Sequence, residues 1–281
     1  MDRRRFLMGI APAAGAALAA RPALASVSTP YDWSASPPRQ SREAFVEWMV
    51  KNRGEEPKFL GQRWDRLQQM IAHHDIWDET DIEAYLLTPR EEFVTAANLD
   101  RAYEWHHLDI GFGVTITGPH TDARMTNTLS VRRGDRALEI GTGSGYQSAY
   151  LSNLTPNVFS IEIIPGLAQR TRALYDRLLG RGYSEYRAIR TRNADGYYGW
   201  EEFAPFDKII VTCGIDHIPP PLLQQLTPDG IMVIPVGPPG AQHVIKATKR
   251  RSEDGSVTIV RSDIYGGAII PFVPFTGTHP S

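Results

Sequence analysis

The chain of 281 residues has little cysteine: Cys213 stands alone. One cysteine excludes an intramolecular disulfide framework, and no neighbouring group marks it as a reactive thiol, so a small buried side chain is the simpler interpretation. The eight histidines include two adjacent pairs, whose side chains point apart on a helix or a strand. No Cys or His-x-x-x-His spacing supports a metal site. The sequence therefore predicts neither a disulfide nor a metal centre.

Neither sign of charge is in excess, since 30 Lys and Arg stand against 32 Asp and Glu, for a formal net charge of −2. This balance shows no electrostatic footprint of a nucleic-acid partner or an anionic membrane. We therefore expect no nucleic-acid partner, and we expect a monomer.

The N-terminal segment, residues 1–25, resembles a twin-arginine signal peptide. Arginines at 3–5 precede a Phe-Leu pair and an Ala- and Gly-rich run, and the Ala-Leu-Ala at 23–25 fits a cleavage site. We expect a periplasmic location if this signal is used, and a cytoplasmic one otherwise. The apolar run of about 15 residues is too short to span a bilayer, so no stable membrane association is expected after cleavage. Residues 26–40, rich in Ser and Pro, are interpreted as a linker.

Residues 41–125 form the next part, which we expect to be mostly helical as far as residue 100. Thr80 and Glu83 have the spacing of a capping box at the start of one of its helices. Large apolar side chains recur there at helical spacing, and we assign them to the core: Phe45, Trp48 and Met49, then Trp64, Leu67, Met70 and Ile71.

The most informative motif is Leu-Glu-Ile-Gly-Thr-Gly-Ser-Gly-Tyr at 138–146. An expected strand, 136–140, ends in three glycines at alternate positions, and a helix is expected to begin at Tyr146. Glycine lets the backbone adopt positive φ and approach a ligand closely, and the free N–H groups of a helix start face what binds there. A packing loop could use the same glycines, so the turn alone is weak evidence.

Three acidic residues stand at the ends of three successive expected strands. Glu139 lies near the end of the first, Glu162 near the end of the second at 157–163, and Asp195 after the third at 186–192. In open α/β sheets this edge binds ligands, and an acid about 20 residues past the Gly turn accepts the ribose hydroxyls of a nucleoside. Three carboxylates without Lys or Arg among them favour a cationic nucleoside over a phosphorylated one. S-adenosylmethionine, with its sulfonium, ammonium and ribose, is such a ligand.

The remaining segments extend this pattern to a Rossmann-like sheet over 126–240, followed by residues 241–281, a hairpin and a tail. The predicted fold class is α/β, with helices on both faces of the sheet, a helical N-terminal part and a C-terminal β-hairpin. Further strands are expected at 206–212 and 231–236, the hairpin at 244–249 and 257–264, and helices at 165–180 and 222–226.

Five segments together carry a family resemblance: the Gly turn, the Pro-Arg-Glu segment, the loop before the first strand, and two segments around the fourth strand. They stand at 138–147, 89–94, 111–119, 204–212 and 217–220. These segments resemble protein-L-isoaspartate O-methyltransferases, which are class I S-adenosylmethionine-dependent enzymes. The resemblance implies S-adenosyl-L-methionine as methyl donor, no metal, and isoaspartyl-containing proteins or peptides as partners in a protein-repair reaction.

The resemblance also implies which residues bind the donor. The Gly turn would hold its methionine and ribose end, an acid the ribose hydroxyls, and a third group the adenine edge. In that order, these residues are Glu139, Gly141, Thr142, Gly143, Ser144 and Gly145; then Glu162; then Ala194 and Asp195.

On the acceptor side, the resemblance implies that Thr115, Ile116 and Thr117 form a substrate loop over the methyl donor. Thr117 would supply the catalytic hydroxyl, where the family usually has Ser; Thr keeps the hydroxyl and adds a methyl group and a stiffer χ1. His120 would contact the substrate carboxylate. A second departure from the family is Trp-His-His at 105–107, where acidic residues and proline are usual.

A carboxylate acceptor is ionised at neutral pH and needs no general base, which agrees with a sequence that shows no Ser/His/Asp or Cys/His constellation. Two alternatives stay open from the residues alone. One is another O- or N-methyltransferase, acting on a small molecule or a modified peptide. The other is an exported, non-catalytic binding module, because the methyl donor is made in the cytoplasm.

Overall fold

The structure is a computed structural model that describes residues 36–252 and 254–277. The expected signal peptide, 1–25, and most of the expected linker lie outside these residues. The N-terminal part contains α1 (Arg42–Arg53), α2 (Pro57–Ala72), α3 (Glu79–Leu87), the 3-10 turns η1 (Arg90–Phe93) and η2 (Ala96–Arg101), and a small hairpin of β1 (Leu108–Asp109) and β2 (Thr115–Ile116).

The main sheet contains β3 (Arg136–Ile140), β4 (Asn157–Glu162), β5 (Ile189–Asn193), β6 (Phe206–Val211), β7 (Leu226–Val236), β8 (His243–Arg251) and β9 (Val257–Asp263). Its helices are α4 (Pro119–Leu129), α5 (Tyr146–Ser152), α6 (Pro165–Gly180) and α7 (Pro220–Gln225), with 3-10 turns η3 (Ser184–Ala188), η4 (Gly196–Tyr198) and η5 (Glu201–Phe203).

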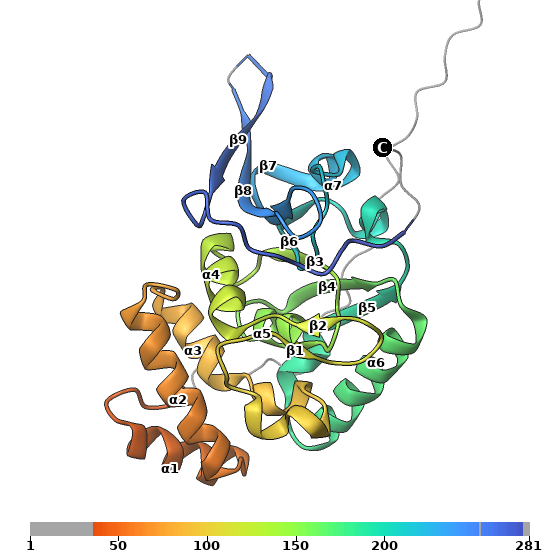
Figure 1. Cartoon of the computed structure of the whole chain (residues 1–281). Coiled ribbons are helices and arrows are strands. Elements are labelled where there is room, and N and C mark those ends of the chain that lie inside the picture. The colour runs from red at the N-terminus through yellow and green to blue at the C-terminus, as the bar shows by residue number, and fades with distance from the viewer. Residues whose placement is uncertain (1–35, 253, 278–281) are drawn as a thin grey trace, which may run out of the picture.

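The seven strands lie in the order β5-β4-β3-β6-β7-β8-β9 (Figure 1). Strands β5 to β7 are parallel, whereas β8 and β9 add antiparallel pairs. The chain passes from β3 outward to β5 on one side and returns to β6 on the other, so the carboxyl end of β3 is a topological switch point, where open sheets form a ligand crevice. This arrangement confirms the expected α/β class.

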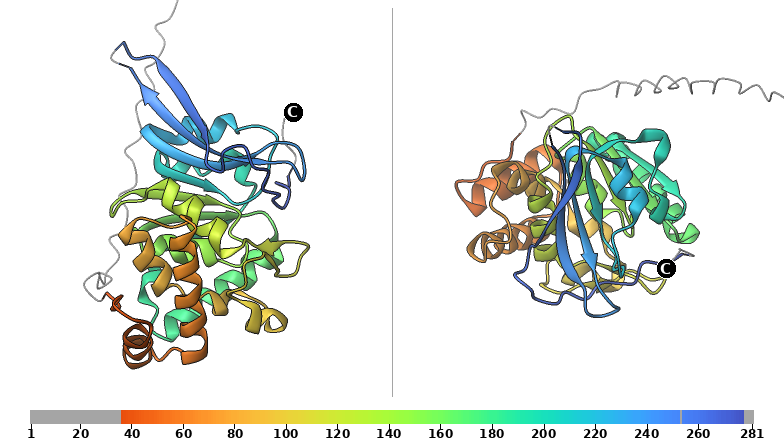
Figure 2. Two further views of the ribbon diagram at one scale, coloured as in Figure 1. Left: turned by 60° about the vertical axis from the view of Figure 1, so that its left-hand side comes forward. Right: turned by 90° about the horizontal axis from the view of Figure 1, so that it is seen from above.

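The expected C-terminal hairpin is also present, and β8 and β9 project from the body of the molecule (Figure 2). Two other boundaries were predicted wrongly. β5 begins at Ile189 rather than 186, because residues 184–188 form η3, whose Tyr186 is buried against other aromatic rings. β7 begins at Leu226 rather than 231, because Leu226 pairs with Phe206 before a register shift, and α7 ends one residue earlier.

The N-terminal helices form as expected, with two corrections. The expected capping box is wrong: α3 begins at Glu79, so Asp78 is its N-cap and its carboxylate accepts a hydrogen bond from the Thr80 N–H at 2.9 Å. Ile71 is 41% exposed, because Met70, fully buried, carries the last core contact of α2. Of the helices in the described ranges, none combines the length and apolarity that a membrane span requires.

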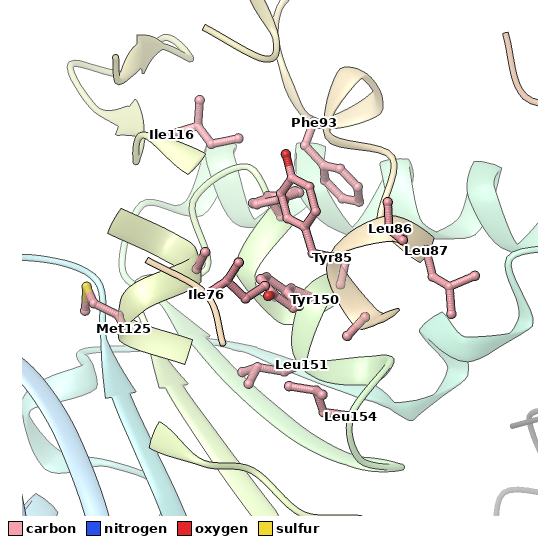
Figure 3. Close-up of a cluster of buried hydrophobic side chains, with 14 of the residues drawn as sticks. Ile76, Tyr85, Leu86, Leu87, Phe93, Ile116, Met125, Tyr150, Leu151 and Leu154 are labelled. Carbon is pink, nitrogen blue, oxygen red and sulfur yellow. The ribbon is translucent and has the colours of Figure 1, made fainter. Parts of the chain in front are cut away.

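The helical N-terminal part packs on the sheet domain through one hydrophobic cluster. Figure 3 shows Tyr85, Leu86 and Leu87 of α3 in one cluster with Tyr150 and Leu151 of α5 and Leu154 of the turn after it. The rings of Tyr85 and Tyr150 lie 6.3 Å apart between centroids. Phe93 of η1 and Ile116 of β2 join the same cluster. Because α5 begins at the Gly turn, this packing holds η1 and the β1–β2 hairpin at a fixed place relative to the sheet edge.

The carboxyl group of Asp81 on α3 lies next to this cluster and destabilises the fold when it is ionised. Asp81 is fully buried, and neither carboxyl oxygen has a hydrogen-bond partner among the described residues. Burial, with a smaller effect of Asp78, raises the pKa of Asp81 to about 7. The folded state therefore binds a proton more tightly than the unfolded chain, whose aspartates titrate near pH 4. Stability should fall as pH rises from about 4 to about 7, and the loss persists above that range.

We predict that Asp81→Asn removes this loss, which is on the order of 4 kcal/mol. The variant should gain more in melting temperature over the wild type at pH 8 than at pH 5. Glu83→Gln on the same helix, a partly exposed site, is the control and should shift the melting temperature little. An equal gain at both pH values would contradict a charge-based cost at Asp81.

Candidate functional site

A cavity of about 530 Å³ lies at the carboxyl edge of the sheet, within the usual size range of small-molecule sites. One end is formed by residues that follow β3, β4, β5 and β6, and the other by the β1–β2 hairpin, the start of α4 and two further segments. The lining includes Ile140, Gly141, Gly143, residues 161–164, Leu167, Gly196, Thr212 and Cys213; then residues 105–107, Val114, Thr115, Thr117, Gly118, His120 and Thr121; and residues 270–276.

The Gly turn requires glycine for steric reasons at two positions. Gly141 has φ 96°, and a Cβ there would lie 2.5 Å from the Thr212 hydroxyl oxygen. Gly145 has φ 94°, and a Cβ there would lie 2.5 Å from the hydroxyl oxygen of Tyr175. That hydroxyl donates to the Gly145 carbonyl at 2.8 Å. The turn therefore packs tightly against Thr212 and Tyr175, while Gly141 and Gly143 lie on the cavity wall.

Glu162 is the acid that faces the cavity. It is 5% exposed, and its carboxylate is held by two backbone donors: Oε2 accepts from the Gly143 N–H at 2.8 Å and Oε1 from the Ile164 N–H at 2.9 Å. Each carboxylate oxygen can accept a further hydrogen bond. Two oriented acceptor oxygens in a cavity are what a pair of neighbouring hydroxyls, as on a ribose, requires.

Glu139 occupies a different environment, behind the wall rather than on it. It is fully buried, and it accepts hydrogen bonds from the Ser148 and Ser160 hydroxyls, while Oε1 has no partner within the described chain. Burial, and to a lesser degree Glu162, raises the pKa of Glu139 to about 8. Glu139 is therefore mostly neutral at pH 7, and the negative charge at this end of the cavity belongs to Glu162. The assignment of Glu139 to donor binding stays a prediction.

Several other predicted donor residues support the wall without lining it. Thr142 and Ser160 share a hydroxyl–hydroxyl hydrogen bond of 2.6 Å, and Ser144 is 7% exposed. Ala194 donates its N–H to the Glu162 carbonyl at 3.0 Å. Asp195 caps η4 by accepting from the Tyr197 N–H at 3.0 Å, and the next residue, Gly196, reaches the cavity.

At the acceptor end, Thr115, Thr117 and His120 line the cavity, whereas Ile116 is buried in the core. His120 stacks on Trp105 with ring centroids 4.4 Å apart and an interplanar angle of 5°. Burial lowers the pKa of His120, which favours the neutral imidazole. Predicted donor and acceptor residues thus meet in one cavity through Gly141, Gly143, Glu162, Thr115, Thr117 and His120.

Sequence reasoning missed the wall formed by residues 270–276, which belonged to the expected tail. This segment pairs with the loop after β6: the Gly214 N–H donates to the Val273 carbonyl at 2.8 Å, and the Phe275 N–H to the Gly214 carbonyl at 2.7 Å. Figure 1 shows it, in dark blue, crossing in front of the sheet. Its apolar residues alternate with prolines in a region otherwise free of predicted elements, which was the available signal.

Trp105, His106 and His107 were noted for their unusual type and not for a role; they line the acceptor end. Cys213 also lines the cavity, and burial raises the pKa of its thiol, which keeps it protonated. Across the residues that the structure covers, no group of three or more His, Cys, Asp or Glu side chains is arranged to hold a metal ion.

Comparison with known proteins shows which family the chain belongs to. Residues 63–278 match the family model for protein-L-isoaspartate(D-aspartate) O-methyltransferase. The chain belongs to this family. Membership confirms the recognition made from the sequence and the enzyme class it implied, an S-adenosylmethionine-dependent protein carboxyl O-methyltransferase.

Two relatives are similar to this chain in sequence over most of their own length. The chain is 44% identical over 193 residues to protein-L-isoaspartate O-methyltransferase 1 of Cupriavidus necator, covering 68% of this chain and 69% of that one. It is 40% identical to the protein-L-isoaspartate O-methyltransferase of Anaeromyxobacter dehalogenans, over 76% of this chain and 98% of that one. Among solved structures, a Plasmodium falciparum homologue in complex with S-adenosyl-L-homocysteine shares the fold, with a TM-score of 0.61, 21% identity, and coverage of 75% and 97%.

We predict that Glu162→Gln weakens binding of S-adenosyl-L-homocysteine, because a buried acceptor for the ribose hydroxyls loses its charge. Hydrogen bonds to charged groups contribute about 1.5–3 kcal/mol, so the dissociation constant measured by calorimetry should rise about 10- to 100-fold. Glu201→Gln, at an exposed acid outside the cavity lining, is the matched control. Unchanged affinity in the Glu162 variant would remove that residue from the donor site.

Proposed function

We propose that the chain transfers a methyl group from S-adenosylmethionine to the free carboxylate of isoaspartyl residues in damaged proteins. The observation that carries this proposal is the single cavity lined at one end by the Gly turn and Glu162 and at the other by Thr115, Thr117 and His120. A donor and an acceptor can therefore meet inside one cavity, and family membership supplies the reaction class.

The residues at the donor end fit S-adenosylmethionine. Glu162 offers two oriented acceptor oxygens. Gly143 leaves room against the cavity wall, because a Cβ atom placed on it would have its nearest neighbours beyond the adjoining residues at 3.8 Å. When bound, S-adenosylmethionine supplies an electrophilic methyl group on a cationic sulfonium. The charge of Glu162 is of the sign that such a ligand requires.

The acceptor end fits an anion. Thr and His side chains line it, and among the described residues that line the cavity Glu162 is the one acid. A carboxylate acceptor would therefore meet hydrogen-bond donors at this end, with the Glu162 carboxylate at the other end of the cavity. Thr117 is half-buried, and we assign its hydroxyl to orienting the acceptor carboxylate by donating a hydrogen bond to it.

The protein's contribution to the rate is alignment. Because a carboxylate is already ionised at neutral pH, no residue has to remove a proton from it. Holding two reactants in line can lower a barrier by about 7–11 kcal/mol. The segment 270–276 closes one side of the cavity and reduces contact with water, which otherwise stabilises an anionic nucleophile.

We predict that the protein transfers radiolabelled methyl groups to an isoaspartyl peptide and not to the aspartyl version of the same peptide. The product should be a base-labile ester. Thr117→Ala should lower kcat by about 10- to 100-fold, the effect of losing one hydrogen bond to a charged group, with Thr117→Ser as the matched control that keeps the hydroxyl. Label on both peptides, or on neither, would overturn the proposed acceptor, and an unaltered rate in Thr117→Ala would remove Thr117 from the site.

We further propose that the protein is exported to the periplasm, on the basis of the arginines at 3–5, the apolar run and the Ala-Leu-Ala at 23–25. Replacing the three arginines by lysines keeps the positive charge and removes the twin-arginine feature. We predict that the wild-type chain is found in the periplasmic fraction at its shortened mass and that the lysine variant stays in the cytoplasm at full length. Cytoplasmic, unprocessed wild-type protein would contradict export.

A further inference from the structure

Two arginines are fully buried in the N-terminal part, Arg63 and Arg90. The Arg90 side chain opens η1 and donates in three directions. Its Nε donates to the Ala102 carbonyl at 2.8 Å, one terminal nitrogen to the Asp122 carboxylate at 3.1 Å, and the other to the Thr117 carbonyl. One guanidinium therefore joins three segments: the turn after η2, the first turn of α4, and residues 111–118, which we call the acceptor loop.

The same guanidinium also reaches the donor side. Its central carbon lies 4.7 Å from the ring centroid of Tyr146, a cation–π contact. Tyr146 is the first residue of α5 and directly follows Gly145, the last glycine of the turn. Arg90 thus contacts the residue that carries the proposed acceptor-side hydroxyl and the residue that ends the donor turn.

The acceptor loop needs such an anchor. Between β1 and β2 it contains three consecutive residues with positive φ, Gly111, Phe112 and Gly113, and its two strands are two residues long each. A hairpin this short has little stability of its own. The bond from Arg90 fixes the loop at its far end, at the residue before the N-cap of α4.

We propose that Arg90 is a positioning residue for methyl transfer. By holding the Thr117 carbonyl against Asp122 and Tyr146, it sets the distance and orientation of the Thr117 hydroxyl relative to the donor turn. This inference rests on the proposed function of the cavity. The planar guanidinium is essential to the role. Its N–H groups point to three separate acceptors, on Ala102, Asp122 and Thr117, while its flat face lies over the Tyr146 ring. A lysine ammonium cannot make all four contacts at once.

Arg63 provides a matched control within the same part of the fold. It is equally buried and its side chain has more hydrogen-bond partners, but these are Tyr103, the Leu86 carbonyl, Glu55 and Glu91, and none of them belongs to residues 111–118. Arg63→Lys and Arg90→Lys should therefore both lower the melting temperature. A purely structural role for Arg90 predicts that the two variants also behave alike in every other measurement.

The test compares three readouts in full-length wild type and the two lysine variants. Arg90→Lys should lower kcat/KM for an isoaspartyl peptide by about 100-fold, the cost of a misplacement of about 1 Å in a reacting group. Affinity for S-adenosyl-L-homocysteine should stay within about threefold, because Glu162 and the Gly turn are retained. Hydrogen exchange of residues 111–118 should accelerate in Arg90→Lys and not in Arg63→Lys.

Equal loss of activity in both variants, or unchanged exchange of residues 111–118 in Arg90→Lys, would overturn the proposal. If Arg90→Lys does not fold, Asp122→Asn replaces it, since it keeps the shape and removes the charge that orients the guanidinium. That variant should show the same pattern with a smaller loss, and wild-type activity and exchange would overturn the proposal. If wild-type protein methylates no isoaspartyl peptide, the proposed function fails, while the exchange measurement still tests the anchor.

Discussion

The carboxylate of Glu162 is the constraint on which the donor end of the cavity depends. It accepts hydrogen bonds from the Gly143 N–H in the turn after β3 and from the Ile164 N–H just before α6. One side chain thus ties the ends of two neighbouring strands together and shapes the Gly turn. A carboxylate held by two N–H donors is kept in one orientation. The same interaction that shapes the turn also presents the charge to the cavity.

Three other buried acids, Asp81, Asp122 and Glu139, have carboxyl groups whose pKa is raised by burial. Burial raises the pKa of Asp122 to about 7, as it does that of Asp81, and it raises that of Glu139 to about 8. Asp122 has Arg90 as a partner, Glu139 has two serine hydroxyls, and neither oxygen of Asp81 has a hydrogen-bond partner within residues 36–252 and 254–277. Burial therefore favours the neutral form of Glu139 and Asp81, whereas the Asp122 carboxylate has the Arg90 guanidinium beside it.

Much of the fold followed from local pattern. The strand 136–140, the glycines after it and the helix from Pro165 to Gly180 were predicted because their signals are short-range: apolar runs, positive φ and proline at a helix start. Predictions went wrong where tertiary contacts decide. Tyr186 entered an aromatic cluster instead of a strand, and Leu226 paired with Phe206 earlier than its own sequence pattern indicates. The cavity wall from residues 270–276 depends on contacts with Gly214 and Gln242, which lie far away in the sequence.

That wall has a consequence for the order in which the protein can mature. Thr276 lines the cavity and follows β9, the last strand of the sheet, whereas Trp105, another lining residue, is made long before. During synthesis, the sheet through β7 and the Gly turn can assemble while the cavity is still open on one side. The cavity becomes complete only after residues 270–276 have been made and have paired with the loop after β6, so a change in this segment acts directly on the site rather than on a remote surface.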